Sequence, residues 1–465
     1  MKDIFVSEEQ ITAQLQTAEK IRAYFESIGR TPQVYAETYG CQQNEADTER
    51  LLGIALKCGY SLTNSAENAD LVLINTCAIR EHAELKVFSK TGGLKKLKEK
   101  NPDMLVMLCG CMAQEAHVGE KIKKSYPYVD VVFGTDMNHR LPELIYKALM
   151  TGKREFYVNE LPHNDFGVIC ENMPTERRSD YKAWVSVMYG CNNYCTYCIV
   201  PYVRGRERSR KPEDVLAEVK HLADNGYKDI TLLGQNVNSY DGGISFPELL
   251  KKASEIEGDF RLRFMTSHPK DASKELVDVM ASTDKIARHF HLPVQSGNNR
   301  ILAAMNRKYT REQYIEKALY IKEKLPFAAL TTDIICGFPG ETEEEFEDTV
   351  SLIKEVGFDM IYCFIYSPRR GTVAEKMPGR IPHDEQVRRF ERLIAAQNDM
   401  SLAANQKYVG KTLRLLSDGD DDGKHVARSS QNKIVTLDKS VAAGSFVNAE
   451  IIAAHPFTLE AKIIQ

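Results

Sequence analysis

The stretch AWVSVMYGCNNYCTYCIVP, residues 183–201, joins a β-strand pattern to three cysteines. Its apolar, β-branched first half predicts a buried strand. Cys191, Cys195 and Cys198 follow in a CxxxCxxC spacing, with no fourth cysteine or histidine in the next twenty residues. A structural zinc site takes four ligands, whereas three thiolates can hold a [4Fe–4S] cube and leave one iron open. The spacing therefore favours an iron–sulfur cluster over a zinc ion completed by a distant ligand.

Five more strand patterns follow, each separated from the next by a helical pattern. The six strand runs are AWVSVMYGC, DITLLGQNVNSY, RLRFMTSHP, HFHLPVQSG, LTTDIICGFPG and MIYCFIYSPRRGT. Six consecutive βα units predict a partial (β/α)6 TIM-like barrel, which we assign to residues 177–402. Each run ends in polar or glycine-rich residues, and in such barrels the chemistry lies at the carboxyl ends of the strands.

A separate α/β pattern precedes this barrel, over residues 31–151. Its strand runs are QVYAETYGC (33–41), DLVLINTC (70–77), DMLVMLCGC (103–111) and VDVVFGTD (129–136). Alternation with helices predicts a doubly wound α/β domain. Three of the runs end in Cys41, Cys77 and Cys111, and ligands of such sheets lie beyond the carboxyl ends of the strands. A lone cysteine is usually a buried apolar thiol, but three at equivalent positions predict a shared site.

The third of these cysteines has a competitor. Cys109 and Cys111 lie on the same face if the strand continues, because side chains two residues apart share a face. Cys111 is closer to the following loop, and we therefore prefer it as the ligand.

Length, net charge and cysteine content limit the class of protein that this chain can be. Its 465 residues suffice for two or three domains, and a net charge of -4 restricts any nucleic-acid contact to local basic patches. The 11 cysteines, with no secretory or membrane-spanning pattern, predict a cytoplasmic protein that uses thiols for metal or catalysis. We expect residues 1–30 to form a polar, helical extension and residues 152–176, with NELPHNDF, to form a linker. Residues 403–465 carry short strand patterns that predict a small all-β barrel.

Several motifs together resemble those of a known family. CNNYCTYC resembles the signature of radical S-adenosylmethionine (SAM) enzymes, in which SAM chelates the open iron. TYGCQQNEADTE, INTCAIREHAELKVFS, CGCMAQE, HLPVQSGNNRIL and IICGFPGETEEEF are similar to the methylthiotransferases of that superfamily. The resemblance covers roughly residues 33–465. It implies a radical SAM cluster on Cys191, Cys195 and Cys198, a second [4Fe–4S] cluster on Cys41, Cys77 and Cys111, and a TRAM-like, RNA-binding β domain at the carboxyl end.

The resemblance also implies further site residues. SAM is expected to contact polar residues at the strand ends, namely Gln235, Asn236, Ser267, Gln295, Asp333 and Gly337; the alternative is that they cap turns. Basic residues that follow the cluster loop and that close the sixth strand, near the mouth of the barrel, are expected to meet RNA phosphates; the alternative is a solvated charged face. These residues are Arg204, Arg206, Arg208, Arg210, Arg369 and Arg370.

The combination YGCQQN, LLGQNVNSY and SHP is most similar to the branch that modifies N6-isopentenyladenosine at position 37 of tRNA. This implies insertion of sulfur and methyl at carbon 2 of the adenine, an unactivated C–H that requires radical chemistry. Expected partners are a tRNA anticodon stem-loop, an electron donor such as flavodoxin or ferredoxin, and a sulfur or cluster donor, with the protein acting as a monomer. Gln43 departs from the methionine expected there. Sibling branches act on threonylcarbamoyladenosine or a ribosomal-protein aspartate. A zinc-containing RNA-binding protein is the non-enzymatic alternative.

Overall fold

The computed structural model describes residues 4–78, 81–158 and 167–464, so the NELPHNDF stretch lies outside it. The chain forms two structural units. The N-terminal unit comprises residues 1–178, 188–192 and 198–210, and the C-terminal unit comprises residues 179–187, 193–197 and 211–465. None of the described helices is both long and apolar enough to cross a membrane.

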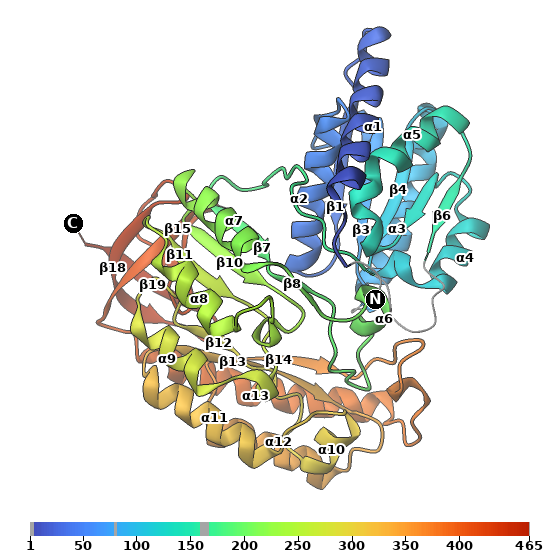
Figure 1. Cartoon of the computed structure of the whole chain (residues 1–465). Helices are drawn as coiled ribbons and strands as arrows, with labels where there is room; N and C mark the ends of the chain where they lie inside the picture. The colour runs from blue at the N-terminus through green and yellow to red at the C-terminus, as the bar shows by residue number, and fades with distance from the viewer. Residues whose placement is uncertain (1–3, 79–80, 159–166, 465) are drawn as a thin grey trace. The chain divides into compact units, whose positions relative to one another are not determined.

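The N-terminal unit is built on a parallel six-stranded sheet (Figure 1). Its strand order is β2-β1-β3-β4-β5-β6. The strands are β1 (Gln33–Thr38), β2 (Ser61–Leu62), β3 (Leu71–Thr76), β4 (Leu105–Gly110), β5 (Val131–Phe133) and β6 (Glu155–Tyr157). The four predicted strands are confirmed. β6 lies inside the range that the sequence assigned to a linker, and that assignment is wrong for these residues because they pair with β5.

Helices cover both faces of this sheet, which confirms the doubly wound α/β fold. One face packs its apolar side chains against α1 (Glu8–Ser27), α2 (Gln42–Lys57) and α5 (Leu141–Thr151). The other face packs against α3 (Glu81–Lys100) and α4 (Ala116–Ser125). Strand residues alternate between the two cores: Leu71 and Leu73 face one, and Val72 and Ile74 the other, as the pleat of a strand requires.

The N-terminal extension is an integral helix of this unit. A reciprocal capping box starts α1, in which the Ser7 side chain accepts from the backbone N–H of Gln10 and the Gln10 side chain accepts in return. Ile21 and Phe25, one turn apart, are buried in the core that α2 and α5 share. The described part of residues 1–30 therefore belongs to the N-terminal fold.

The C-terminal unit contains the predicted partial barrel. Its six strands are β7 (Lys182–Ser186), β10 (Asp229–Leu233), β11 (Arg261–Phe264), β12 (His289–His291), β13 (Ala329–Cys336) and β14 (Met360–Ile365). They form two parallel three-stranded sheets, β11-β10-β7 and β12-β13-β14, and a parallel bridge between Leu262 and Ile286 joins them just before β12. The helices between them are α7 (Pro212–Asp224), α8 (Phe246–Glu255), α9 (Lys274–Ser282), α10 (Asn299–Ala304), α11 (Arg311–Lys324) and α12 (Glu343–Val356).

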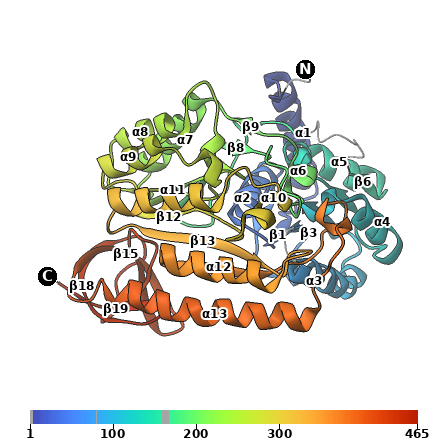
Figure 2. The same ribbon diagram turned by 90° about the horizontal axis from the view of Figure 1, so that it is seen from below.

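A long helix, α13 (His383–Gln406), packs against α12 and leads to the C-terminal β-barrel (Figure 2). The barrel is closed in the order β15-β16-β17-β19-β18, which confirms the predicted all-β fold. Its strands are β15 (Thr412–Asp421), β16 (Lys424–Arg428), β17 (Ile434–Leu437), β18 (Phe446–Ala454) and β19 (Thr458–Ile463). Because α13 continues to Gln406, the proposed boundary at residue 403 falls within a helix.

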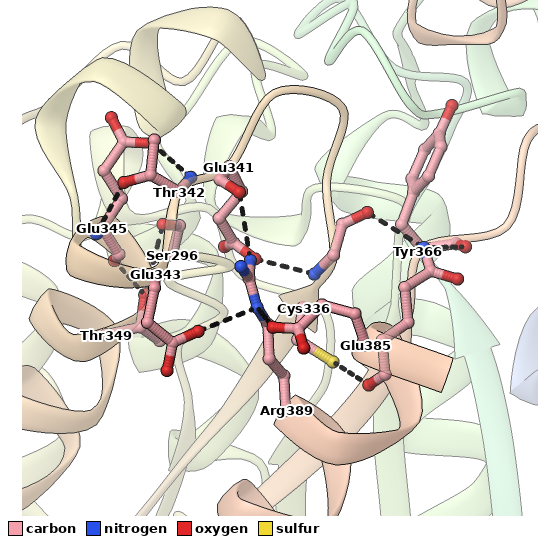
Figure 3. A network of polar contacts seen from close by, with 12 residues as sticks. Ser296, Cys336, Glu341, Thr342, Glu343, Glu345, Thr349, Tyr366, Glu385 and Arg389 are labelled. Atoms are coloured by element: carbon pink, nitrogen blue, oxygen red, sulfur yellow. Dashed lines mark hydrogen bonds and ion pairs between the residues drawn. The ribbon is translucent and has the colours of Figure 1, made fainter. Parts of the chain in front are cut away.

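A buried ion pair fixes the turn that follows β13. Figure 3 shows Arg389 of α13 pointing at Glu341, and its Nη1 lies 2.8 Å from Glu341 Oε2. The same carboxylate oxygen accepts a 2.8 Å hydrogen bond from the backbone N–H of Gly337. Arg389 also donates to Glu385 from Nε. Both members of the pair are buried, and burial raises the pKa of Glu341 despite its partners. The turn thus depends on the guanidinium.

Replacing Arg389 with methionine is expected to destabilise the C-terminal unit by about 3–5 kcal/mol, because Glu341 is left buried without its counter-charge. The midpoint of urea unfolding measures the loss. Arg388→Met is the matched control, since Arg388 lies beside Arg389 on α13 with a side chain that is 51% exposed. Equal midpoints for the two variants would contradict a stabilising role for the buried pair.

Candidate active site

Three cysteines lie at one edge of the N-terminal sheet. Cys41 follows β1, Cys77 follows β3 and Cys111 follows β4. These strands are adjacent and parallel, in register near their carboxyl ends, where Thr76 of β3 pairs with Gly110 of β4. The expected convergence therefore follows from strand direction and sheet order.

Two glycines allow these strand ends to approach closely. A Cβ at Gly40 would lie 3.0 Å from the Cβ of Cys77. A Cβ at Gly110 would lie 2.6 Å from the carbonyl oxygen of Thr76, and the Gly110 φ of +93° is one that other residues rarely adopt. The Gly-Cys pairs in YGC and CGC are thus requirements of the packing.

Buried amides fix the same strand ends. Asn44, fully buried at the start of α2, donates from Nδ2 to Asn75 Oδ1 and to the Thr76 carbonyl, both at 3.0 Å. Its own Oδ1 lies 3.4 Å from the Sγ of Cys41. Asn75 in turn donates to the Asn44 carbonyl. Because these polar groups satisfy one another, the strand-end turns are held together before any metal binds.

Arg204 makes a direct hydrogen bond to one thiol of this set. Its Nε donates to Cys111 Sγ at 3.1 Å, and its Nη2 donates to Asp47 at 2.8 Å. Both arginine and aspartate are buried. Burial raises the pKa of the Cys111 thiol to about 12 and outweighs the lowering effect of Arg204, while Cys77 and Cys41 raise it further. The three thiols are therefore close enough to interact electrostatically.

The structure also separates Cys111 from its competitor. β4 ends at Gly110, so the strand does not continue through Cys111. Cys109 packs into the core beneath α2 and α5, whereas Cys111 belongs to the core on the opposite face. This supports Cys111 as the third ligand.

The donor set can be tested against the implied group. In the described part of the chain, no three His, Cys, Asp or Glu side chains are arranged to hold a single metal ion. A [4Fe–4S] cube binds each thiolate through a different iron, so its ligands do not converge on one point. Three interacting thiols at one edge, with Arg204 donating to one of them, fit a cube better than a mononuclear site.

The CxxxCxxC loop has residues in both units. In the N-terminal unit, the N–H of Cys191 donates to the Gly205 carbonyl at 3.2 Å, and Cys198 comes just before α6 (Val200–Arg204). β8 (Met188–Tyr189) precedes these segments in the sequence and β9 (Arg208–Ser209) follows them. The two short strands pair in antiparallel fashion.

Cys195 lies in the C-terminal unit. Its Sγ accepts a hydrogen bond from Nη1 of Arg307 at 3.3 Å. Asn306, which has a positive φ, donates from its side chain to the carbonyls of Asn193 and Tyr194. The segment that follows α10 therefore fixes the backbone and the thiol of this part of the loop.

Polar atoms without partners gather at the ends of β10 and β11. Gln235 Oε1, Asn236 Oδ1 and Ser267 Oγ are buried and have no hydrogen-bond partner among the described residues. Neither side-chain amide atom of Asn238 has one either. Native structures rarely leave buried polar atoms unpaired. This arrangement fits a polar ligand at the place where the sequence predicted SAM contacts.

The other three predicted SAM residues differ among themselves. Gln295 is buried at a φ of +74° and Asp333 is half-buried, with one carboxylate oxygen 3.6 Å from Nε2 of His291. Gly337 has both backbone groups in hydrogen bonds of the turn. Its N–H donates to Glu341 and its carbonyl accepts from Gln386, and its contact with SAM stays a prediction.

His268 was not among the residues singled out from the sequence, although the SHP motif that contains it was. Its Nδ1 accepts from the backbone N–H of Lys270 at 3.1 Å, so the ring proton is on Nε2. Burial lowers the His268 pKa to about 2, with the charges of Arg307 and Lys270 contributing. Nε2 is a buried donor with no partner among the described residues.

Two of the predicted phosphate contacts are also corrected. Arg204 is buried against Cys111 and Asp47, and Arg210 is buried in an ion pair with Glu171 at 2.7 Å, so neither reaches a phosphate. Arg208 is half-buried and donates to two backbone carbonyls. Of the remaining residues, Arg206 and Arg370 are exposed and Arg369 is half-buried.

Gly110→Ala is expected to abolish iron binding by Cys41, Cys77 and Cys111 and to destabilise the N-terminal unit by about 1–3 kcal/mol, because the strained φ and the clash push β4 from β3. Iron analysis after anaerobic reconstitution measures this, in a background where alanines replace Cys191, Cys195 and Cys198. Gly93→Ala is the control, since a Cβ there meets nothing within 4 Å. Normal iron content in the Gly110 variant would show that the close approach is not needed.

Two family models match the chain. Residues 185–353 match the model described as Radical SAM superfamily, and residues 33–134 match the model described as Uncharacterized protein family UPF0004. The matched ranges contain the CxxxCxxC loop and the three strand-end cysteines, respectively.

Curated relatives match almost the whole chain. A tRNA-2-methylthio-N(6)-dimethylallyladenosine synthase from Thermoanaerobacter sp. (strain X514) is 46% identical over 472 residues, which cover 100% of this chain and 99% of the relative. An enzyme of the same name from Clostridium perfringens (strain SM101 / Type A) is 48% identical over 437 residues, 92% of this chain and 97% of the relative.

Among solved structures, the radical S-adenosylmethionine methyltransferase TsrM from Kitasatospora setae, with cobalamin and a [4Fe-4S] cluster bound, matches with a TM-score of 0.56. Its sequence identity is 14%, over 74% of each chain, so this likeness concerns the fold alone. The near-complete coverage by the curated relatives is decisive. This chain belongs to the radical SAM family of tRNA-2-methylthio-N6-dimethylallyladenosine synthases.

Proposed function

We propose that this protein is the methylthiotransferase that converts N6-isopentenyladenosine at position 37 of tRNA to its 2-methylthio derivative. The observation that carries the proposal is the 46% identity to a synthase of that name over 100% of this chain and 99% of the relative. Such coverage includes both cysteine sets and the C-terminal barrel, and it favours this substrate over those of the sibling branches. It also disfavours a non-enzymatic zinc protein.

The cysteines of the CxxxCxxC loop are assigned to the radical SAM cluster. Cys191, Cys195 and Cys198 would bind three irons and leave the fourth for SAM. When bound and reduced, this cluster and SAM supply the radical that removes hydrogen from an unactivated carbon. Arg307 and Asn306 hold the Cys195 part of the loop, and thereby orient one ligand.

SAM would lie at the carboxyl ends of β10 and β11. Gln235, Asn236 and Ser267 each offer a buried oxygen that lacks a partner among the described residues. His268 adds an Nε2–H donor to the same region, suited to an anionic or carbonyl group of the ligand. Gln295 and Asp333, at the ends of β12 and β13, are proposed as further contacts.

Cys41, Cys77 and Cys111 are assigned to a second [4Fe–4S] cluster with its own open iron, which when bound supplies the site of sulfur delivery. Support comes from their position at one sheet edge and from the Arg204 contact to Cys111. The chain's contribution is to hold the three thiolates and to keep water from them, since Cys77 and Cys111 are buried.

The tRNA is proposed to contact exposed cations and the C-terminal barrel. Arg206 and Arg370 are exposed and Arg369 is half-buried, so each keeps some surface on which a phosphate contact is proposed. The α/β domain that the sequence placed at residues 31–151 also takes in α1 and β6, and the boundary between the radical SAM core and the TRAM-like domain, expected at residue 403, is proposed to follow the end of α13 at Gln406. A cytoplasmic monomer, served by a flavodoxin or ferredoxin and a separate sulfur donor, fits a reduced-thiol enzyme with this substrate.

The direct test supplies anaerobically reconstituted protein with SAM, a reductant and tRNA that bears N6-isopentenyladenosine at position 37. Mass spectrometry of the digested nucleosides should show a methylthio gain, which Cys195→Ala and Cys77→Ala should each abolish because each removes a cluster ligand. Cys58→Ala, which replaces a buried core thiol, should retain product. Formation of 5′-deoxyadenosine without a modified nucleoside would contradict the substrate assignment, and absence of both from iron-loaded protein would contradict the enzyme assignment.

His268→Asn is expected to weaken SAM binding about 10- to 100-fold, the equivalent of about 1.5–3 kcal/mol for a lost hydrogen bond to a charged group. Asparagine can still accept from the Lys270 N–H, so the turn is kept and only the Nε2–H donor is lost. Equilibrium dialysis measures the affinity, with the exposed His221→Asn as control. Because the His268 pKa is lowered to about 2, the ring stays neutral, and this group adds no pH dependence to binding between pH 6 and 8. Wild-type affinity in the variant would remove His268 from the SAM site.

A further inference from the structure

Each of the two proposed cluster sites contains one thiol that accepts a hydrogen bond from a buried arginine. In the N-terminal unit, Arg204 donates to Cys111 at 3.1 Å. In the C-terminal unit, Arg307 donates to Cys195 at 3.3 Å. Both guanidiniums are more than nine-tenths buried. Burying a charge costs free energy unless the charge is paired or hydrogen-bonded.

The remaining contacts show that both arginines are held rigidly. Arg307 donates from Nε to the Tyr309 hydroxyl at 2.8 Å and from Nη2 to the Pro293 carbonyl at 2.8 Å. Arg204 is anchored by Asp47, on α2, at 2.8 Å. Neither side chain can leave its thiol without breaking these bonds, so each hydrogen bond to sulfur is a fixed feature of its site.

The two sites differ in how the positive charge is balanced. Arg204 is paired with the buried carboxylate of Asp47. Arg307 forms no ion pair with any carboxylate in the part of the chain that the structure describes, and its partners are a hydroxyl, a carbonyl and a thiol. The first site thus receives a neutral ion pair and the second a full positive charge.

Reduction of an iron–sulfur cluster adds one negative charge. A hydrogen bond to a ligating sulfur and a nearby positive charge both stabilise that added charge, and these are the factors by which proteins raise cluster potentials. The effect is strong where the dielectric constant is low, as it is around buried groups. In the Arg204–Asp47 pair the arginine is the charge nearer to the thiol, so the pair stabilises the added negative charge through the arginine and its hydrogen bond. When the arginine is removed, the negative charge of Asp47 is left unbalanced.

We infer that Arg204 and Arg307 are positioning residues that each raise the reduction potential of their own cluster, and that Asp47 sets the size of the Arg204 effect. This inference rests on the proposed function, because it requires both clusters. It adds a role that sequence motifs did not indicate: Arg204 was expected to bind RNA, and Arg307 was not singled out.

The test is redox titration of each cluster alone, monitored by electron paramagnetic resonance. Alanines at Cys191, Cys195 and Cys198 leave only the cluster on the strand-end cysteines. In this background Arg204→Gln should move the midpoint to a more negative value by at least a tenfold change in the one-electron equilibrium, about 59 mV. Arg307→Gln should leave it unchanged. The reciprocal background has alanines at Cys41, Cys77 and Cys111 and keeps only the cluster on the CxxxCxxC loop. There Arg307→Gln should move the midpoint to a more negative value, and Arg204→Gln should leave it unchanged.

The double variant Asp47→Asn with Arg204→Gln separates charge from structure. Removing both charges restores the electrostatic balance of the site, so the midpoint should return towards the wild-type value. A merely structural role for Arg204 predicts a double variant at least as far displaced as the single one. Urea unfolding of the same proteins checks that the folds are intact.

The outcomes are distinct. An iron-loaded protein whose midpoint does not move in Arg204→Gln, or does not recover in the double variant, would overturn the inference while leaving the proposed function intact. Protein that binds no iron after loss of Cys191, Cys195 and Cys198 would overturn the second cluster, and the role of Arg204 with it. Shifts of both clusters by either arginine would overturn the pairing of one arginine with one cluster.

Discussion

The direction of the β-strands is the constraint on which both sites depend. Every strand pair in the N-terminal sheet and in the two halves of the partial barrel is parallel. The residues that follow adjacent strands therefore gather at one edge, although helices separate them in sequence. A single antiparallel strand in place of β3 would carry Cys77 to the opposite edge. Cys41, Cys77 and Cys111 therefore come to the same edge through the order and direction of their strands, without being close in sequence.

Buried polar groups at the strand ends of the two units are partnered to different extents. In the N-terminal unit, Asn44 and Asn75 bind each other and the Thr76 carbonyl, which fixes the frame around the thiols. In the C-terminal unit, Gln235 and Ser267 carry buried atoms without partners among the described residues. Satisfied groups stabilise a rigid metal frame, whereas unsatisfied ones cost free energy until a ligand binds. The Asn44–Asn75 pair thus suits a fixed arrangement of thiolates, although the amide of Gln114, close after Cys111, is also buried without a partner among the described residues.

Strand periodicity was enough to predict the sheets and the strand-end positions of the cysteines from the sequence. It was not enough to predict the fate of charged side chains. The run from Arg204 to Arg210 has the pattern of a solvated basic face, yet its first and last members are buried by Asp47 and Glu171, which lie far away in the chain. Arg307 carried no signal, because its partner Cys195 is 112 residues away. The backbone N–H of Gly337 likewise donates to Glu341, a contact that strand periodicity does not indicate.

One short stretch of chain, from Cys198 to Arg204, contributes to both cysteine sets. Cys198 is assigned to the radical SAM cluster, and α6, which starts two residues later, ends in Arg204, the donor to Cys111. Both ends of this stretch belong to the N-terminal unit. The segment from Cys198 to Arg204 therefore carries one predicted ligand of the radical SAM cluster at its start and, at its end, the arginine that donates to a predicted ligand of the other cluster. Because Arg204 is also anchored by Asp47 of α2, its hydrogen bond to Cys111 is held by the N-terminal fold and does not depend on the cysteine ligands of the CxxxCxxC loop.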